Sequence, residues 1–248
     1  LCSALESENP MEKLTNTKKM INLIGIAFGM KYLHKHNIIH RHLRCSNILL
    51  DSDFQPKISG LSAARINVAN NEQFGNSIPF YFLAPELADG TMQYSFPVDV
   101  FAFGMLFYHV ISNKEPMIEH RSKCDFFIKI MNGATLNLDG IPPQFHAFIK
   151  RMCDKEPDNR PTFDDIIDKL LHSRGECWLD DVDEKEIERY IHQFGATLKT
   201  RNQSEYIDII NGIHDRLPAN ISRTVIGLTT STLMSNQKVI IDLAKTLH

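Results

Sequence analysis

The sequence predicts a mainly α-helical fold. Apolar residues recur at helical spacing from Lys18 to about His36, which indicates one long amphipathic helix. A strongly apolar run from Val100 to Ile111 follows Phe96-Pro97 and indicates a helix buried in the core. The composition, 43% hydrophobic and 23% charged over 248 residues, is typical of a globular protein with one sizeable core or two small domains.

Shorter elements are expected between and after these two helices. The residues before the turn signal Asn9-Pro10 predict a small helix. Two β-prone runs, Ile48–Leu50 and Lys57–Ile58, predict a small hairpin whose turn is Asp51-Ser52-Asp53. Thr162 is expected to cap a helix that runs to about His172. Further helical patterns cover residues 118–131, 143–152, 187–194, 206–216 and 238–247.

Charge and cysteine content exclude several classes of function. The 27 basic and 30 acidic residues give a formal net charge of -3 with both signs interspersed, so no basic stripe favours a nucleic-acid partner. The five cysteines are scattered without a Cys-x-x-Cys pair, which favours a reducing, intracellular and cytoplasmic location. The run 100–111 is shorter than the roughly 20 residues of a membrane helix, and no signal peptide is visible, so no membrane association is expected.

Four motifs carry the chemistry of the chain. The first packs eight residues between two apolar runs: His40-Arg41-His42-Leu43-Arg44-Cys45-Ser46-Asn47. Leu83-Ala84-Pro85-Glu86, Asp99 with Phe103-Gly104, and Arg160-Pro161-Thr162 follow in order. This set resembles eukaryotic protein kinases, whose catalytic loop reads His-Arg-Asp-Leu, three variable residues, then Asn. The resemblance covers about residues 1–172 and is strongest to tyrosine-kinase-like serine/threonine kinases.

The resemblance implies catalytic and nucleotide-site roles for four residues. His42 stands where the family has the Asp that accepts the proton of the substrate hydroxyl. Arg44 follows it in the same loop, and Asn47 keeps the position of the family's magnesium ligand. Leu49 would belong to the nucleotide site. Because an imidazole has replaced the acid, the loop resembles a kinase loop without its proton acceptor.

The resemblance also implies structural roles for five residues. His40 would be a packed core residue, Arg41 would belong to the loop framework, and Asp99 would bind the loop backbone. Arg160 would form an ion pair with Glu86, and loss of either partner should destabilise the fold, since a stranded buried charge costs about 3 to 5 kcal/mol.

Two parts of the family pattern are missing. Lys57-Ile58-Ser59-Gly60-Leu61-Ser62 falls where the family has Asp-Phe-Gly, whose Asp holds magnesium. Either Gly60-Leu61-Ser62 replaces that triplet, or Asp-Phe is deleted and Gly60 is the surviving Gly. The glycine-rich phosphate loop, strand lysine and paired glutamate of an N-terminal β lobe are also not found. The chain opens on Leu1 rather than Met, which suggests a piece of a longer product.

The expected domain organisation follows from this. Residues 1–172 would form a protein-kinase-like C-terminal lobe, helical with a small β-hairpin and without the N-terminal β lobe. Residues 173–195 would form an acidic linker and an amphipathic helix. Residues 196–248 would form a helical tail of unknown function.

Several interpretations of single residues remain open. His42 could act as a general base, since an unperturbed imidazole accepts protons near neutrality, although an imidazolium beside magnesium would be repelled. Asn47 could hold magnesium or make a structural bond within the loop. His34, His36, His40 and His42 could bind a metal, but His34 and His36 end a helix, where cations are favoured, and His40 is a packed core residue in the family, so no metal is expected. Ser62, Ser77 and Thr91 are candidate phosphorylation sites that could pair with Arg41.

The resulting functional expectation is a pseudokinase. It would act as a scaffold or regulator in intracellular signalling by binding protein partners, including an active kinase or an upstream N-terminal lobe. ATP and magnesium would bind only if the degenerate site is still competent. One alternative is an active serine/threonine kinase seen as a fragment, and another is a purely structural helical module.

Overall fold

The computed structural model describes residues 1–7, 14–61, 64–66, 82–87, 94–116, 125, 128–129, 132, 136–173 and 177–200. This part of the chain is mainly helical, as predicted. Its α-helices are α1 (Cys2–Glu6), α2 (Asn16–Lys35), α3 (Phe96–Ser112), α5 (His146–Met152), α6 (Phe163–His172) and α8 (Glu184–Thr200). Its strands are β1 (Ile38–Ile39), β2 (Ile48–Leu50), β3 (Pro56–Ile58) and β4 (Arg65–Ile66). Short 3₁₀ helices are η1 (Cys45–Asn47), η4 (Pro85–Leu87), η5 (Pro143–Phe145) and η6 (Pro157–Asn159).

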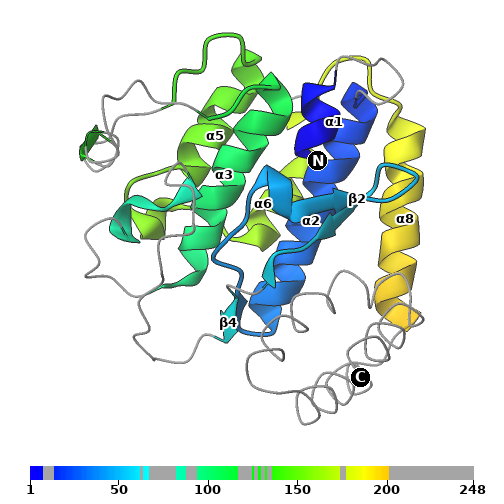
Figure 1. Cartoon of the computed structure of the whole chain (residues 1–248). Coiled ribbons are helices and arrows are strands. Elements are labelled where there is room, and N and C mark those ends of the chain that lie inside the picture. The colour runs from blue at the N-terminus through cyan, green and yellow to red at the C-terminus, as the bar shows by residue number, and fades with distance from the viewer. Residues whose placement is uncertain are drawn as a thin grey trace.

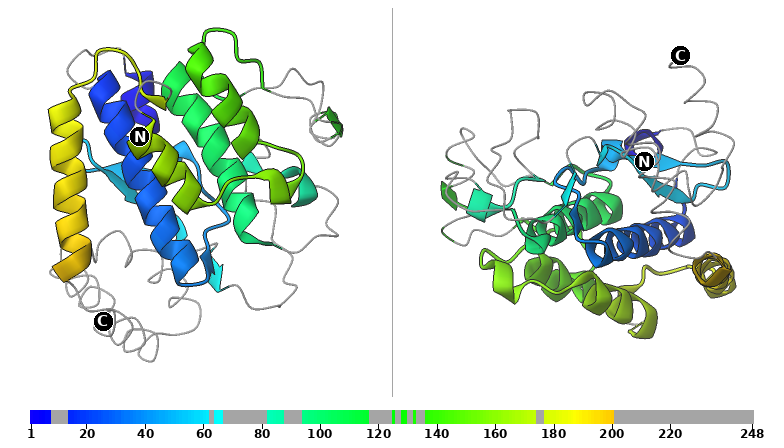
Figure 2. Two further views of the ribbon diagram at one scale, coloured as in Figure 1. Left: turned by 180° about the vertical axis from the view of Figure 1, so that it is seen from behind. Right: turned by 90° about the horizontal axis from the view of Figure 1, so that it is seen from below.

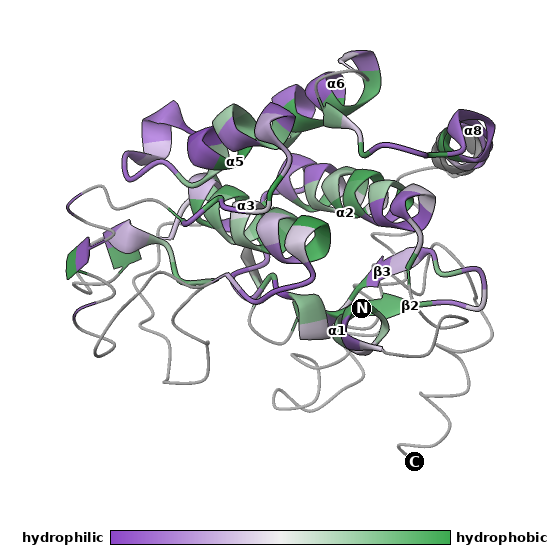
Figure 3. Ribbon diagram, turned by 90° about the horizontal axis from the view of Figure 1, so that it is seen from above, coloured by the Kyte–Doolittle hydropathy of each residue, from purple (hydrophilic) through white to green (hydrophobic). Residues whose placement is uncertain are grey.

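The helices pack in layers, with the β2–β3 hairpin on one side. Viewed from above, α5 and α6 form one layer, α2 and α3 form the next, and β2, β3 and α1 lie on the opposite side of α2 (Figure 3). Helix α8 lies along the outer edge of α2 (Figure 1), and the view from below agrees (Figure 2). The expected helices at 118–131, 206–216 and 238–247 lie wholly or largely outside the described residues.

Helix α2 begins at a side-chain cap and is more buried than its pattern predicts. Thr15 accepts a hydrogen bond from the Lys18 N–H at 3.2 Å, which satisfies one of the free amides of the first turn. The sequence predicted an amphipathic helix, yet Lys19 and Asn22 are buried along with the apolar residues. Neighbours surround this helix: α3, α6, α8 and the β2–β3 hairpin all contact it. That tertiary packing, which periodicity cannot show, explains the difference.

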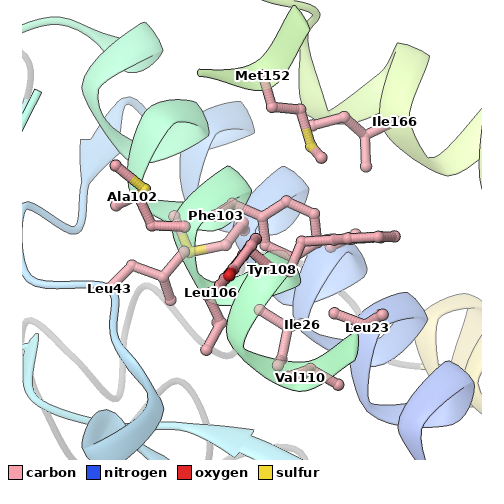
Figure 4. Packing of buried hydrophobic residues seen from close by; sticks show 14 of the residues in the cluster. Leu23, Ile26, Leu43, Ala102, Phe103, Leu106, Tyr108, Val110, Met152 and Ile166 are labelled. Atoms are coloured by element: carbon pink, nitrogen blue, oxygen red, sulfur yellow. The ribbon is translucent and has the colours of Figure 1, made fainter. Parts of the chain in front are cut away.

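Helix α3 forms the centre of the hydrophobic core. Residues 98–111 are all buried, and the Phe103, Leu106, Phe107 and Val110 side chains have no exposed surface. Figure 4 shows α3 side chains facing Leu23 and Ile26 of α2 on one side and Met152 and Ile166 on the other. Burying a large apolar side chain contributes about 1.5 to 3 kcal/mol. The core therefore fixes the start of α3, where Asp99 lies.

The predicted hairpin is present, and a second strand pair was not predicted. β2 and β3 are antiparallel, with Ile48 opposite Ile58. Asp51 stabilises the turn by accepting hydrogen bonds from the backbone N–H groups of Asp53 and Gln55 at 3.0 and 2.9 Å. The second pair joins β1 to β4. Each of its strands has two residues, which is too short for an alternating pattern to appear in the sequence.

Helix α6 matches the predicted bounds and cap, whereas helix α8 extends beyond the residue where the linker and helix were expected to end. Thr162 caps α6 in a capping box with Asp165, as predicted for this threonine. Helix α8 continues to Thr200 and so crosses residue 195, where the linker was expected to end. It is fixed to α2 by the Lys18–Glu186 ion pair at 2.9 Å and by a hydrogen bond from the Asp183 N–H to the Thr17 hydroxyl oxygen. None of the described helices is both long and apolar enough to cross a lipid bilayer.

Candidate functional site

Asp99 organises the start of the loop that carries the first motif. It lies in the first turn of α3 and is 1% exposed. Its carboxylate accepts hydrogen bonds from the backbone N–H groups of His40 and Arg41, both at 2.8 Å, and contacts His34 Nε2 at 3.0 Å. The expected contact between Asp99 and the loop backbone is therefore present. Each bond to a charged group contributes about 1.5 to 3 kcal/mol, so this carboxylate holds the loop firmly.

His40 is fully buried and links the loop to the segment after β3. Its Nδ1 accepts a hydrogen bond from the His42 N–H at 3.2 Å, so Nε2 carries the ring proton and donates to the Ser59 carbonyl oxygen at 3.0 Å. Burial lowers the pKa of His40, while Asp99 and the bond to Ser59 act in the opposite direction. The neutral ring acts as a connector within the core, in agreement with the packing role that the sequence implied.

Arg41 adopts a strained backbone conformation that packing maintains. Its φ of 67° lies in the left-handed region, which costs a residue with a Cβ about 1 kcal/mol or more. The side chain is 7% exposed, and its guanidinium carbon lies 3.6 Å from the centre of the Tyr94 ring. Asp99 and Tyr94 thus fix Arg41 from two sides.

His42, which the resemblance places at the position of the proton acceptor, has few polar contacts through its side chain. The residue is half-buried, and its Nε2 atom is buried with no hydrogen-bond partner. Burial lowers the pKa of the imidazole, and the nearby Arg44 and His40 lower it further. A lowered pKa means that the ring is neutral at pH 7 and is a weaker base than free histidine.

Arg44 and Leu49 complete the residues expected near the nucleotide. Arg44 is half-buried, and its Nε also lacks a hydrogen-bond partner. Leu49 is 54% exposed, a large fraction for a leucine in a strand. The side of β2 that carries Leu49 is therefore open, whereas Ile48 before it is buried.

Asn47 makes structural bonds within the loop. Its side-chain Nδ2 donates to the His42 carbonyl oxygen at 2.7 Å, and its backbone oxygen accepts from the Ser59 N–H at 2.7 Å and hydroxyl at 2.9 Å. Gly60 packs directly on the Asn47 amide: a Cβ added at Gly60 would lie 2.5 Å from Asn47 Cγ. Gly60 also has a φ of 78°. Gly60, which contacts the Asn47 amide, therefore has no side chain, and a residue with a Cβ would fit there only if the amide shifted.

Away from the loop, Arg160 forms the expected ion pair with Glu86. The contact is bidentate, with both N···O distances 2.7 Å, and the two side chains are 0% and 5% exposed. Arg160 also donates to the carbonyl oxygens of Asp154 and Pro97. Such a fork-to-carboxylate geometry is the strongest form of this pair. It joins the Ala-Pro-Glu motif of η4 to the start of α3.

The structure separates the four clustered histidines instead of directing them at one point. His34 contacts Asp99, His36 contacts the Tyr32 carbonyl oxygen at 2.8 Å, and His40 contacts Ser59. Within the described ranges, no three side chains of His, Cys, Asp or Glu are grouped as a metal ion would require. Ser62, Ser77 and Thr91 lie outside those ranges.

Sequence reasoning missed one residue of this site. His34 was expected only as a helix-terminal cation, whereas it contacts the Asp99 carboxylate from α2 and packs between Phe96 and Phe163. No local signal could reveal it, because the partner lies 65 residues further along the chain. The resemblance alone named Asp99 as a central residue.

Comparison with known proteins agrees with this geometry. The family model described as protein tyrosine and serine/threonine kinase matches residues 1–170. An Acanthamoeba polyphaga mimivirus protein named as a serine/threonine-protein kinase/receptor is 32% identical over 170 residues, which are 66% of this chain and 10% of that protein. Rat ephrin type-A receptor 6 is 33% identical over 159 residues, 61% of this chain and 15% of the receptor.

Human receptor-interacting serine/threonine-protein kinase 1 is 30% identical over 167 residues, which are 60% of this chain and 25% of that kinase. The chain thus spans between 10% and 25% of the length of these three relatives. The family match covers well over half of the chain and includes the loop, the Ala-Pro-Glu and Arg-Pro-Thr motifs and the residues that connect them. The chain belongs to the protein tyrosine and serine/threonine kinase family.

Proposed function

We propose that this kinase-family domain is a pseudokinase that serves as a scaffold or regulator through contacts with protein partners. The observation that carries the proposal is the loop from His40 to Asn47. Its framework is complete, with Asp99 bound to its backbone, while the position of the proton acceptor holds His42. Phosphoryl transfer depends mainly on positioning and charge stabilisation. A loop framework that lacks the acidic groups for these tasks therefore supports a role in binding proteins more than a role in catalysis.

His42 is a poor substitute for the acid. A carboxylate can accept the hydroxyl proton beside a divalent cation, whereas a protonated imidazole in that place is repelled. The lowered pKa of His42, caused mainly by burial and also by the neighbouring Arg44, makes proton acceptance weaker still. These properties support a residue that packs within the loop and does not serve as a base.

The contacts of Asn47 do not fit a magnesium ion. Magnesium prefers an octahedral set of oxygen ligands that includes at least one carboxylate. Asn47 donates its Nδ2 to the His42 carbonyl oxygen and packs on Gly60, and within the described residues no three side chains of His, Cys, Asp or Glu are grouped as a metal ion would require. We therefore propose that neither magnesium nor ATP is a working cofactor of this chain, and no phosphoryl-transfer step is derived for it.

The proposed partners are proteins, among them an active kinase or a separate N-terminal kinase lobe. We propose that such a partner contacts the side of β2 where Leu49 is exposed. Nucleic acid and membrane are not proposed as partners. A cytoplasmic location fits Cys2, Cys45 and Cys153, which form no disulfide.

The alternative is an active serine/threonine kinase of which this chain is one part. The preserved ion pair, Asp99 contacts and Asn47 favour it, because active kinases need the same framework. It requires His42 to act as the base and an acid from elsewhere to hold the metal. A purely structural helical module would instead bind neither nucleotide nor kinase-type partners.

Two measurements on the 248-residue chain distinguish these functions. The first is the melting temperature with ATP, with and without magnesium, where we expect a change below about 1 °C. The second is transfer of labelled phosphate to a protein substrate, where we expect none above background.

His42→Ala and His172→Ala form the matched pair for the transfer measurement, because His172 is a well-exposed histidine on α6. A magnesium-dependent rise in melting temperature would contradict the cofactor proposal. Phosphate transfer that is lost in His42→Ala and kept in His172→Ala would establish the active-kinase alternative instead.

A further inference from the structure

Residues 177–191 form a strap that packs along the lobe and lies outside the residues matched by the family model. The start of the strap is fixed to α6, because the Trp178 indole N–H donates to the Leu170 carbonyl oxygen at 2.6 Å. The rest of the strap leads into α8, where Ile187 and Tyr190 are buried one helical turn apart. Helix α8 therefore turns one apolar face toward the lobe, and α2 is the helix that it contacts there.

The first turn of α2 holds the start of α8. The Asp183 N–H donates to the hydroxyl oxygen of the buried Thr17 at 2.8 Å. The Asp183 carboxylate in turn caps α8 by accepting from the Glu186 N–H at 3.0 Å. The side chain of Glu186 then meets Lys18, whose Nζ lies 2.9 Å from Glu186 Oε1. The strap is thus bound to two consecutive residues of α2.

Lys18 binds the β2–β3 hairpin with the same ammonium group. Its Nζ donates to the Asp53 carbonyl oxygen at 2.7 Å, and Asp53 lies in the turn between the two strands. One turn further along α2, the buried Asn22 donates to the Phe54 carbonyl oxygen at 2.9 Å. Figures 1 and 3 show this hairpin turn on the side of α2 that α8 borders. Lys18 therefore bridges the strap and the hairpin turn.

A second contact joins α8 to the hairpin at Gly25. The space that a Cβ of Gly25 would fill is bordered by the Tyr190 hydroxyl of α8 and by Pro56 Cγ of β3, which would lie 2.6 Å away. Gly25 follows Lys18 by about two turns on the same face of α2. The strap and the hairpin therefore meet at two levels of that helix.

Both strands of the hairpin lead directly into the candidate site. Strand β2 begins at Ile48, the residue after Asn47, and Ser59 follows the end of β3. Ser59 donates to the Asn47 backbone oxygen through its N–H and its hydroxyl, and its own carbonyl oxygen accepts from His40 Nε2. A shift of the hairpin is therefore carried into the loop by two three-residue strands and by these bonds.

We propose that the strap is a regulatory element of the fold: its docking on α2 holds the β2–β3 hairpin in place, and its release loosens the hairpin and the loop at Asn47. Without Glu186, the long side chain of Lys18 regains rotamer freedom, which weakens its bond to Asp53. A two-stranded hairpin depends on such support, because it is only marginally stable alone. The coupling does not depend on the proposed function, since it applies to any molecule that binds beside the loop.

The test is hydrogen exchange of the full chain, compared between the parent and Tyr190→Ala, which removes the ring that meets Gly25. In the parent, we expect the amides of residues 48–58 to exchange faster than the most protected amides of α3, which indicates partial opening of the lobe. In the variant, we expect the amides of α8 and of residues 48–58 to exchange at least about tenfold faster than in the parent.

His192→Ala is the matched control, because His192 is an exposed residue of the same helix. It should leave both sets of amides at the parent rate. Trp178, the one tryptophan of the chain, reports whether each variant stays folded, since its fluorescence emission should match that of the parent.

Glu186→Gln is a milder second variant, which keeps the size of the side chain and removes the charge opposite Lys18. It should raise exchange at the hairpin turn, residues 51–54, by about two- to fivefold. If Tyr190→Ala gives the Trp178 emission of an unfolded chain, the exchange rates of Glu186→Gln decide the question.

Two results would overturn the proposal. In the first, exchange becomes faster in α8 while residues 48–58 keep the parent rate, which would mean that the hairpin opens independently of the strap. In the second, residues 48–58 exchange at the rate of the most protected α3 amides in parent and variant alike, which would mean that only unfolding of the whole lobe exposes the hairpin.

Discussion

The two ends of the loop from His40 to Asn47 are built differently. At the first end His40 and Arg41 are buried, their backbone N–H groups are bound by Asp99, and Arg41 maintains a left-handed conformation. Beyond them, His42 and Arg44 are half-buried, and each has a buried nitrogen with no hydrogen-bond partner. The first end is buried and is held through its backbone N–H groups by Asp99, whereas the second is only half-buried.

The difference shows what the fold itself requires. A buried carboxylate with several hydrogen bonds cannot be removed without leaving orphaned donors, so Asp99 is constrained by stability alone. The proton acceptor contributes to catalysis and little to packing, so it can change while the fold persists. A kinase-type framework is therefore compatible with a histidine at residue 42.

The largest effect is expected at Asp99. Asp99→Ala removes the acceptor of the His40 and Arg41 N–H groups and the partner of His34, and should lower the free energy of unfolding by about 5 kcal/mol. Denaturant unfolding measures this. His42→Ala, in the other end of the same loop, should change the same quantity by less than about 1 kcal/mol. Equal losses in both variants would remove the distinction between the ends.

The ion pair of Arg160 and Glu86 extends the framework beyond the loop. Each single variant, Arg160→Ala and Glu86→Ala, should lose about 3 to 5 kcal/mol, because the remaining charge is buried and unpaired. The double variant should lose clearly less than the sum, as a double-mutant cycle would show. Single variants that melt like the parent would mean that this buried pair does not stabilise the fold.

Close packing on α8 should give an intermediate effect. A Cβ at Gly25 of α2 would overlap the Tyr190 hydroxyl of α8 and approach Pro56 Cγ at 2.6 Å. Gly25→Ala should therefore cost about 1 to 3 kcal/mol of unfolding free energy. The matched variant Gly29→Ala meets the end of the flexible Ile58 side chain and should cost less. If the order is reversed, α8 is not part of the framework.

The smallest effect concerns the pH dependence of His42. Its folded pKa is lowered below the ordinary value of about 6.5, so the unfolded chain binds more protons at mildly acidic pH and stability falls as pH drops below about 6.5. His42→Gln should flatten that slope by a fraction of the roughly 1.4 kcal/mol per pH unit that one proton carries, since the ring is only half-buried. Urea unfolding between pH 7 and pH 5 measures it, and an unchanged slope would contradict the lowered pKa.

Local sequence signals were sufficient for several elements. Helix α3 followed from an uninterrupted apolar run, α6 from the Thr162 cap, and the hairpin from two short β-prone runs around an aspartate turn. The ion pair of Arg160 with Glu86 came from the family resemblance, since no property of the two separate motifs joins them.

Other features depended on contacts between distant residues. The burial of Lys19 and Asn22 reflects the neighbours that surround α2, and the contact of His34 with Asp99 joins two helices. Each needs the tertiary arrangement, which periodicity and composition do not contain.

The packing of Gly60 on Asn47 limits which side chains residue 60 can carry. An aspartate at residue 60 would need its Cβ in the space that the Asn47 amide occupies, on a backbone with a φ of 78° that favours glycine. A carboxylate therefore cannot be added at this position without shifting the amide that donates to the His42 carbonyl oxygen.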